Sequence, residues 1–321
     1  MQNPVQPRKK PKRIFKVKQG QVILGHCEDV LRDPQFRKKY LGKIQLIFTS
    51  PPFPLNLKKK YGNFQGKAYL KWLREFGPLF AEYLKPNGSV VMEIGNAWEK
   101  GSPTQSILPY QALLGFLQSG GFKLCQEITY YNPAKLPTPA QWVTIERIRL
   151  KDATSKVWWM AKTARPKASN RRVLKPYSKA MLKLLERGSY NSGRRPSEHQ
   201  ISENGFLKKN KGAIASNLIE AANTRSESPY QSFCRKHRVE PHPARMPAKV
   251  ADFFVRFLTN KNDLVLDPFS GSNTTGTVAN ALGRKWISIE AVPSYAAAGV
   301  SNLNEKRAKK LLKQFRSAKK S

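Results

Sequence analysis

Short apolar runs alternate with segments of helical spacing along most of this chain. Seven of these runs predict strands, at residues 21–24, 44–48, 89–94, 125–131, 156–161, 264–267 and 286–289. Apolar residues recur at helical spacing from Tyr69 to Leu84, where 85–88 predicts a closing turn, and again over 248–259. Strands that alternate with helices predict an α/β fold with a mostly parallel sheet and helices on both faces.

The pattern weakens between residues 165 and 241. This segment is rich in Arg, Lys, Ser and Asn and has little periodicity. We interpret it as an inserted recognition region rather than as part of the sheet. It separates one half of the sheet, at 19–164, from a second half at 242–305, and basic tails are expected at 1–18 and 306–321.

The charge of the chain indicates a polyanionic partner. There are 58 Lys and Arg residues against 21 Asp and Glu residues, which gives a net charge of +37. A charge of this size favours nucleic acid as the partner. The basic ends are expected to be disordered or peripheral, but basic residues also occur throughout the middle of the chain.

Several other classes are disfavoured. No apolar run is long enough to span a membrane, and the basic N-terminus lacks the apolar segment of a signal peptide. The three cysteines form no CxxC pair, which fits a reducing compartment. Cys234, His237 and His242 are close in sequence, but a fourth ligand and the usual zinc spacing are missing, so no metal is expected.

The strand at 44–48 leads into an unusual segment, Thr49-Ser50-Pro51-Pro52-Phe53. Each proline fixes its own φ and pushes the preceding residue toward extended geometry. The prolines offer carbonyl acceptors without competing donors, Ser50 adds a hydroxyl, and Phe53 adds a flat apolar face. Such a segment suits a planar ligand with an amino group, such as cytosine or adenine, although a strand end followed by a turn is the simpler interpretation.

A second informative segment covers residues 263–290. A strand ends at Asp267, a turn containing Gly271 leads into a helix from about Thr274, and the next strand ends at Glu290. This order is the nucleoside-binding arrangement of doubly wound folds, in which the acid accepts hydrogen bonds from the ribose hydroxyls. Neither a P-loop nor a full GxGxxG is present, which favours S-adenosylmethionine over a dinucleotide.

Together these segments resemble the beta-class, circularly permuted DNA N4-cytosine methyltransferases of restriction–modification systems. The resemblance covers roughly residues 20–300 and rests on five stretches, at 49–53, 131–137, 194–199, 242–249 and 267–276. It implies a Rossmann-like seven-stranded S-adenosylmethionine-dependent methyltransferase fold with an inserted target-recognition region. It also implies that the strand ending at Asp267 lies beside the strand that leads to Ser50.

The resemblance assigns roles to individual residues. Ser50 and the Pro51 carbonyl would accept the two amino hydrogens of a cytosine flipped out of the duplex, and Phe53 would stack on its ring. The residues expected in catalysis are Ser50, Pro51, Pro52 and Phe53. Those expected to bind the cofactor are His242, Pro243, Asp267, Phe269, Gly271, Ser272, Asn273, Thr274 and Glu290. Arg194 and Arg195 are expected to contact DNA. Lys58, Lys59 and Lys60 are expected near flanking phosphates, with a solvated loop as the alternative.

The expected partner is double-stranded DNA in the cytoplasm of a prokaryote, in association with the nucleoid and without a membrane. A restriction endonuclease that acts on the same site without forming a stable complex is a further expected partner. Methylation of adenine N6 on the same fold, a structured RNA substrate and a non-catalytic DNA-binding protein are the alternatives.

Overall fold

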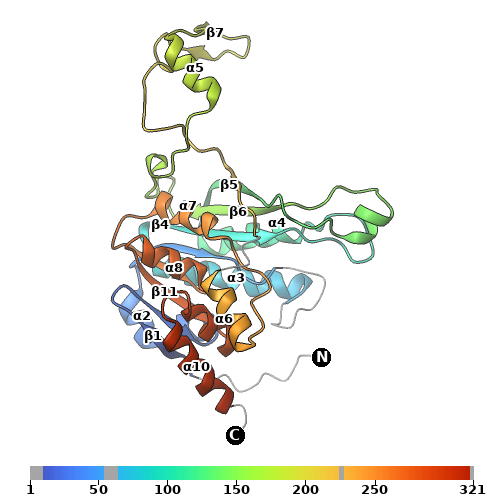
Figure 1. The fold of residues 1–321 in the computed structure, drawn as a ribbon, viewed down its shortest axis with the longest axis vertical. Coiled ribbons are helices and arrows are strands. Elements are labelled where there is room, and N and C mark those ends of the chain that lie inside the picture. The colour runs from blue at the N-terminus through green and yellow to red at the C-terminus, as the bar shows by residue number, and fades with distance from the viewer. Residues whose placement is uncertain (1–9, 54–63, 224–227, 319–321) are drawn as a thin grey trace. The chain divides into compact units, whose positions relative to one another are not determined.

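The computed structural model describes residues 10–53, 64–223 and 228–318. Their contacts divide into two compact units (Figure 1). The main unit contains the described residues of 1–168 and 217–321, and the second unit contains residues 169–216.

A nine-stranded sheet forms the centre of the main unit, with the strand order β1-β2-β11-β10-β3-β4-β6-β5-β9. Five of its eight neighbouring pairs are parallel, so the prediction of a mostly parallel sheet is confirmed. The seven predicted strands all occur, and β1 and β9 extend the sheet at its two edges. The strands are β1 (Lys12–Lys16), β2 (Gly20–Leu24), β3 (Ile44–Thr49), β4 (Leu84–Gly95), β5 (Lys123–Tyr131), β6 (Thr154–Ala161), β9 (Leu218–Glu220), β10 (Leu264–Asp267) and β11 (Lys285–Glu290).

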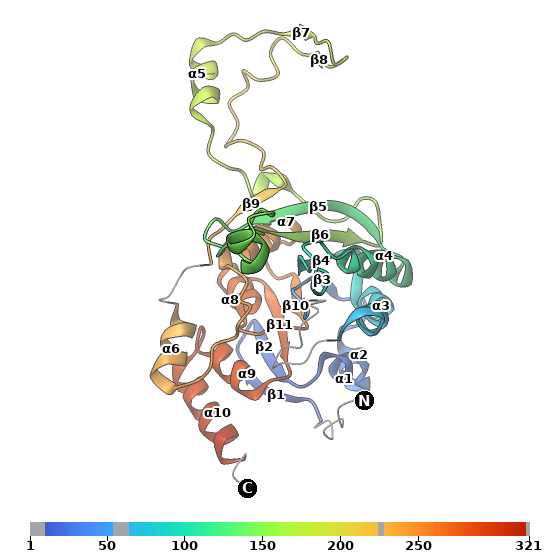
Figure 2. The ribbon, with the colours of Figure 1, turned by 90° about the vertical axis from the view of Figure 1, so that its right-hand side faces the viewer.

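Helices cover both faces of the sheet, and each face has its own apolar core (Figure 2). The first face carries α1 (Cys27–Arg32), α2 (Pro34–Tyr40), α3 (Gly66–Tyr83) and α4 (Leu108–Gly120). The second face carries α6 (Pro229–His237), α7 (Ala248–Leu258), α8 (Thr274–Ala281), α9 (Pro293–Val300) and α10 (Glu305–Ser317). No helix in the described parts of the chain has both the length and the apolarity to cross a bilayer.

The predicted helices are confirmed with small changes at their ends. In α7, the fully buried residues Val250, Phe254 and Leu258 form the stripe that the helical spacing predicts. Helix α3 ends at Tyr83, and Leu84 already belongs to β4. The expected closing turn at 85–88 therefore lies within that strand, as an irregularity between Leu84, which pairs with Ile44, and Ser89, which pairs with Leu46.

For the described residues of the two basic ends, the structure corrects the expectation that they are disordered or peripheral. Residues 12–16 form β1, in which Ile14 and Phe15 are buried, and residues 305–317 form α10, which buries Leu311 and Leu312. Arg307 joins the two segments by donating to the Ile14 carbonyl at 2.9 Å. Both segments are rich in lysine and arginine. Their few apolar residues pack into the same apolar core, and this is sufficient for docking.

The second unit contains η2 (Asn170–Arg172), α5 (Lys179–Arg187), β7 (Gly193–Arg194) and β8 (Gln200–Ile201). It is narrower than the recognition region expected at 165–241. The described residues of 217–241 belong to the main unit, because β9 pairs with β5 and α6 buries Tyr230 and Phe233. The short helical segment η1 (Gln141–Ile145) lies between β5 and β6 of the main unit.

Candidate active site

The carboxyl ends of four neighbouring strands lie side by side. Strands β11, β10, β3 and β4 are parallel neighbours, and they end at Glu290, Asp267, Thr49 and Gly95. The expectation that the strand ending at Asp267 lies beside the strand leading to Ser50 is therefore confirmed. Thr49 Oγ1 donates to Asp267 Oδ1 at 2.8 Å and so links the two strand ends directly.

The turn after β10 depends on two residues with left-handed backbone. Gly271 has φ 49° and Asn273 has φ 60°, so Asn takes a conformation at which Gly is more usual. Asp267 Oδ1 accepts from the Phe269 backbone N–H at 3.1 Å and thereby fixes the start of the turn. Burial raises the pKa of Asp267 to about 6, and hydrogen bonds from Thr275, Thr49 and the Phe269 amide oppose that rise.

Glu290 supports the same turn from the end of β11. One of its carboxylate oxygens accepts from the Gly271 N–H and the other from the Val292 N–H, both at 2.8 Å. Burial raises the pKa of Glu290 to about 7, the two backbone hydrogen bonds lower it, and the nearby Asp267 raises it further. A buried carboxylate with free lone pairs remains, as ribose recognition requires.

Two further features fit a bound nucleoside. The side-chain amide nitrogen of Asn273 is buried and has no hydrogen-bond partner among the described residues, while its Oδ1 accepts from the Ser288 hydroxyl at 2.7 Å. Gly271 lies under the His242 ring: a Cβ at this position would stand 3.2 Å from the imidazole, so a side chain would press against the ring, and the left-handed φ also favours Gly. His242 and Gly271, both predicted to bind cofactor, are therefore neighbours in the structure.

The other predicted cofactor residues lie around this turn. The Ser272 and Thr274 hydroxyls are 3.0 Å apart. The Phe269 ring packs against Trp72 and Phe76 of α3, with centroid distances of 5.6 Å and 5.5 Å. Pro243 is exposed beside His242. Sequence segments from both halves of the chain therefore form the surroundings of the turn.

The Ser-Pro-Pro-Phe segment follows β3 directly. Pro51 is buried, Pro52 and Phe53 are partly exposed, and the Phe53 ring lies on Gly95 at the end of β4. A Cβ at Gly95 would come within 2.6 Å of that ring, so the glycine makes room for the aromatic face. The predicted DNA contacts at Lys58, Lys59 and Lys60 lie outside the described residues.

The structure adds Glu93, which the sequence reasoning missed. Glu93 lies on β4, is 7% exposed, and forms side-chain hydrogen bonds with Ser50 and Ser155. Burial raises its pKa, while those hydrogen bonds and the charge of Lys135 oppose the rise. An acid inside the apolar run at 89–94 was the available signal, because a buried carboxyl needs a partner.

Arg194 and Arg195 belong to the second unit. Arg194 forms an ion pair with Glu198, and both side chains are exposed. Arg195 donates from Nη2 to the Asn191 carbonyl at 2.6 Å, which holds its guanidinium against the backbone of its own unit.

In this doubly wound sheet, a nucleoside-type turn follows β10 and a rigid acceptor segment follows its neighbour β3. This is the arrangement of an α/β methyltransferase. A family model described as DNA methylase matches residues 44–301. The Type II methyltransferase M.PvuII of Proteus hauseri is 43% identical over 271 residues, which are 82% of this chain and 80% of that protein. The chain therefore belongs to the DNA methylase family.

Two further similarities concern the base that such enzymes modify. The solved structure of PvuII DNA methyltransferase (cytosine-N4-specific) matches with a TM-score of 0.74 and 33% identity, covering 94% of each chain. The DNA adenine methyltransferase YhdJ of Escherichia coli (strain K12) is 43% identical over 65 residues, which are 20% of this chain and 24% of that protein. The long similarity is thus to a cytosine-N4 enzyme.

Proposed function

We propose that this protein transfers a methyl group from S-adenosylmethionine to the N4 amino group of a cytosine flipped out of double-stranded DNA. The observation that carries the proposal is the position of Ser50. This residue follows β3, beside the cofactor turn of β10, and its hydroxyl is hydrogen-bonded to the buried Glu93. Similarity over most of the chain to M.PvuII and to the cytosine-N4-specific structure supports the same base.

The cofactor supplies a methyl group that its sulfonium activates for displacement. Glu290 would accept hydrogen bonds from the ribose hydroxyls, because its carboxylate keeps lone pairs beyond those used by the Gly271 and Val292 amides. His242 over Gly271 would close the turn against water.

The acceptors of the Ser-Pro-Pro-Phe segment orient the base. Cytosine N4 is a weak nucleophile because its lone pair is delocalised into the ring. Ser50 Oγ and the Pro51 carbonyl would accept its two amino hydrogens and turn the lone pair toward the methyl group, so that much of the catalysis is positioning. Phe53, supported by Gly95, would stack on the ring.

Glu93 would receive the proton that the reaction releases. After methyl transfer, N4 carries a positive charge and must lose one hydrogen. We assign this step to Ser50, whose oxygen takes the N4 proton while its own hydroxyl proton passes to Glu93. Burial raises the pKa of Glu93, so this carboxylate holds a proton more readily than an exposed one would.

We further propose that residues 169–216 read the recognition sequence, with Arg194 and Arg195 among the DNA contacts, and that Lys58, Lys59 and Lys60 contact flanking phosphates. The net charge of +37 supports a polyanionic substrate. Because M.PvuII is a Type II methyltransferase, a restriction endonuclease directed at the same sequence is the proposed counterpart, acting without a stable complex.

Mass spectrometry of the reaction product tests the proposal. Purified protein, S-adenosylmethionine and DNA of varied sequence should yield N4-methylcytosine after digestion to nucleosides. Ser50→Ala should abolish most turnover and keep cofactor affinity, while the matched change Ser102→Ala in a turn after β4 should have no effect. N6-methyladenine as the main product would overturn the base assignment. Methylated RNA in place of DNA would overturn the substrate class.

A further inference from the structure

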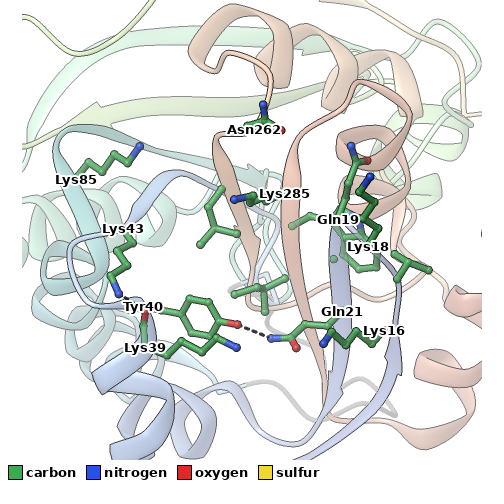
Figure 3. A pocket seen from close by; sticks show the side chains of 15 residues that line it. Lys16, Lys18, Gln19, Gln21, Lys39, Tyr40, Lys43, Lys85, Asn262 and Lys285 are labelled. Atoms are coloured by element: carbon green, nitrogen blue, oxygen red, sulfur yellow. Dashed lines mark hydrogen bonds between the residues drawn. The ribbon is translucent and has the colours of Figure 1, made fainter.

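A cavity of about 560 Å³ lies at the amino ends of the parallel strands, whereas the candidate active site lies at their carboxyl ends (Figure 3). Its walls include the first residues of β2, β10 and β11, which are Gly20, Leu264 and Lys285. Lys285 and Glu290, the first and last residues of β11, are about 17 Å apart at a rise of about 3.3 Å per residue. A phosphate held at Lys285 therefore lies far from the residues proposed for methyl transfer.

The lining of the cavity is strongly basic. Six lysines contribute to it, and the described lining residues include no Asp or Glu. The lysines come from the β1–β2 hairpin, the end of α2, and the beginnings of β3, β4 and β11: Lys16, Lys18, Lys39, Lys43, Lys85 and Lys285. The apolar side chains of Leu264, Trp286 and Ile287 belong to the same lining, and a concave wall of this kind focuses positive potential.

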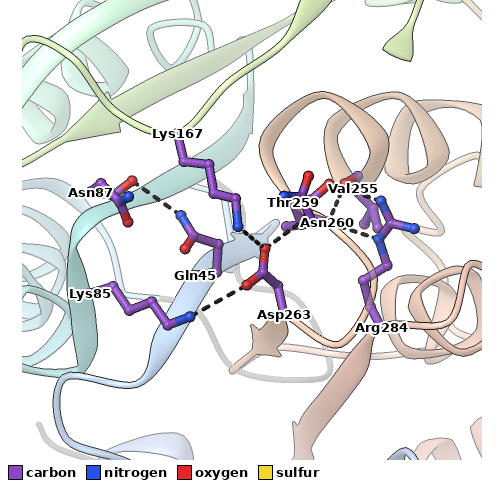
Figure 4. Close-up of polar contacts among 9 residues, drawn as sticks. All are labelled: Gln45, Lys85, Asn87, Lys167, Val255, Thr259, Asn260, Asp263 and Arg284. Carbon is purple, nitrogen blue, oxygen red and sulfur yellow. Dashed lines mark hydrogen bonds and ion pairs between the residues drawn. The ribbon is translucent and has the colours of Figure 1, made fainter.

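Contacts within the fold account for three of these lysines. The Lys39 ammonium lies over the Tyr40 ring, 5.2 Å from its centroid. Lys43 donates to the Lys39 carbonyl at 2.8 Å and so caps the end of α2. Lys85 lies 3.4 Å from Asp263, but Lys167 approaches the same carboxylate at 2.6 Å (Figure 4). Lys167, which does not line the cavity, thus neutralises the Asp263 carboxylate.

The other lysines have no such role. Lys16, Lys18 and Lys285 are exposed and form no ion pair with any residue that the structure describes. Helix ends do not explain them either, since two lie in the β1–β2 hairpin and the third begins β11. Like charges gathered around one concavity repel each other unless an anion lies between them.

We propose that this cavity is a second anion site, which binds clustered phosphate groups. Lysine ammonium groups bind phosphate as point charges, and the volume is within the usual range for small-ligand pockets. Neutral donors and acceptors complete the lining, including Gln21, whose amide donates to the Tyr40 hydroxyl at 3.0 Å. The phosphates come from either a free nucleoside polyphosphate or a single strand of nucleic acid.

Calorimetry with inorganic tripolyphosphate on the full chain tests this site. The double variant Lys18→Gln/Lys285→Gln removes two cavity charges. The matched control Lys310→Gln/Lys313→Gln removes two exposed charges from α10. The cavity variant should bind tripolyphosphate about tenfold or more weakly than the control, because each lost charged contact contributes substantially. Equal affinities in the two variants would overturn the proposal.

Two further measurements complete the test. If the double variant unfolds at a lower temperature than the control, the single reversal Lys18→Glu in the exposed hairpin replaces it and should show the same loss. Uridine triphosphate and an oligothymidylate of about eight nucleotides, compared in the same two variants, distinguish the source of the phosphates. If the cavity variant binds the oligothymidylate more weakly than the control does, the phosphates are those of nucleic acid. If only the binding of uridine triphosphate is weakened, they are those of a free nucleotide.

Discussion

The affinity for S-adenosylmethionine should fall when the solution is made mildly acidic, because Glu290 must be ionised to accept from the ribose. Its pKa in the folded protein without cofactor is about 7, raised by burial from an ordinary value of 4.5. A single carboxyl with a pKa of about 7 loses roughly 30-fold in affinity between about pH 8 and about pH 5.5, or about 2 kcal/mol.

The sign for folding is the opposite of the sign for binding. The folded pKa of Glu290 lies above its unfolded value, so this group contributes stability below about pH 4.5 that is lost as the pH rises through about 7. Asp267, with a folded pKa of about 6, acts in the same direction. Mild acid should therefore favour the folded protein through these two groups while it weakens cofactor binding.

Calorimetry across this pH range, in two buffers with different ionisation enthalpies, measures the affinity and counts the protons exchanged. The Glu290→Gln variant should bind weakly at every pH and lose most of the pH dependence, since an amide does not titrate. The exposed Glu203→Gln variant is the matched control and should behave as the unchanged protein does. A pH dependence that persists undiminished in a folded Glu290→Gln variant would refute the ribose assignment.

Four other outcomes are expected. Glu93→Gln should lower turnover by at least about tenfold and alter the pH–rate profile with cofactor affinity unchanged, and an unaltered profile would remove Glu93 from the proton path. Gly95→Ala should displace the Phe53 ring, which lies 2.6 Å from the added Cβ, and reduce single-turnover rates; an unaffected rate would separate Phe53 from base stacking. Leu311→Ala should cost about 2–5 kcal/mol of unfolding free energy in denaturant titrations, whereas an unchanged midpoint would mean that α10 adds no stability. Replacing residues 170–215 by a Gly/Ser linker should leave S-adenosylmethionine binding intact and remove sequence preference in methylation; preference that survives would place recognition elsewhere.

The sequence by itself determined the elements and the type of turn. Apolar spacing of period 2 or 3.6 depends only on neighbours in the chain, so the seven strands and the helix stripes were predictable. The turn at Gly271 was predictable for the same reason, because the tolerance of glycine for left-handed backbone is a local property. The resemblance to a permuted family also gave the correct neighbours for β3 and β10.

Tertiary structure alone decided which polar groups meet. Glu93 was one acid in a buried strand, and only the parallel pairing of β3 with β4 makes it the partner of Ser50. The raised pKa of Glu290 likewise results from burial, which no local pattern specifies. The docking of β1 and α10 could not be predicted from the sequence. Their few apolar side chains bury enough area only when a matching surface exists elsewhere in the fold. Contacts between distant segments depend on the whole chain, and therefore local sequence could not reveal them.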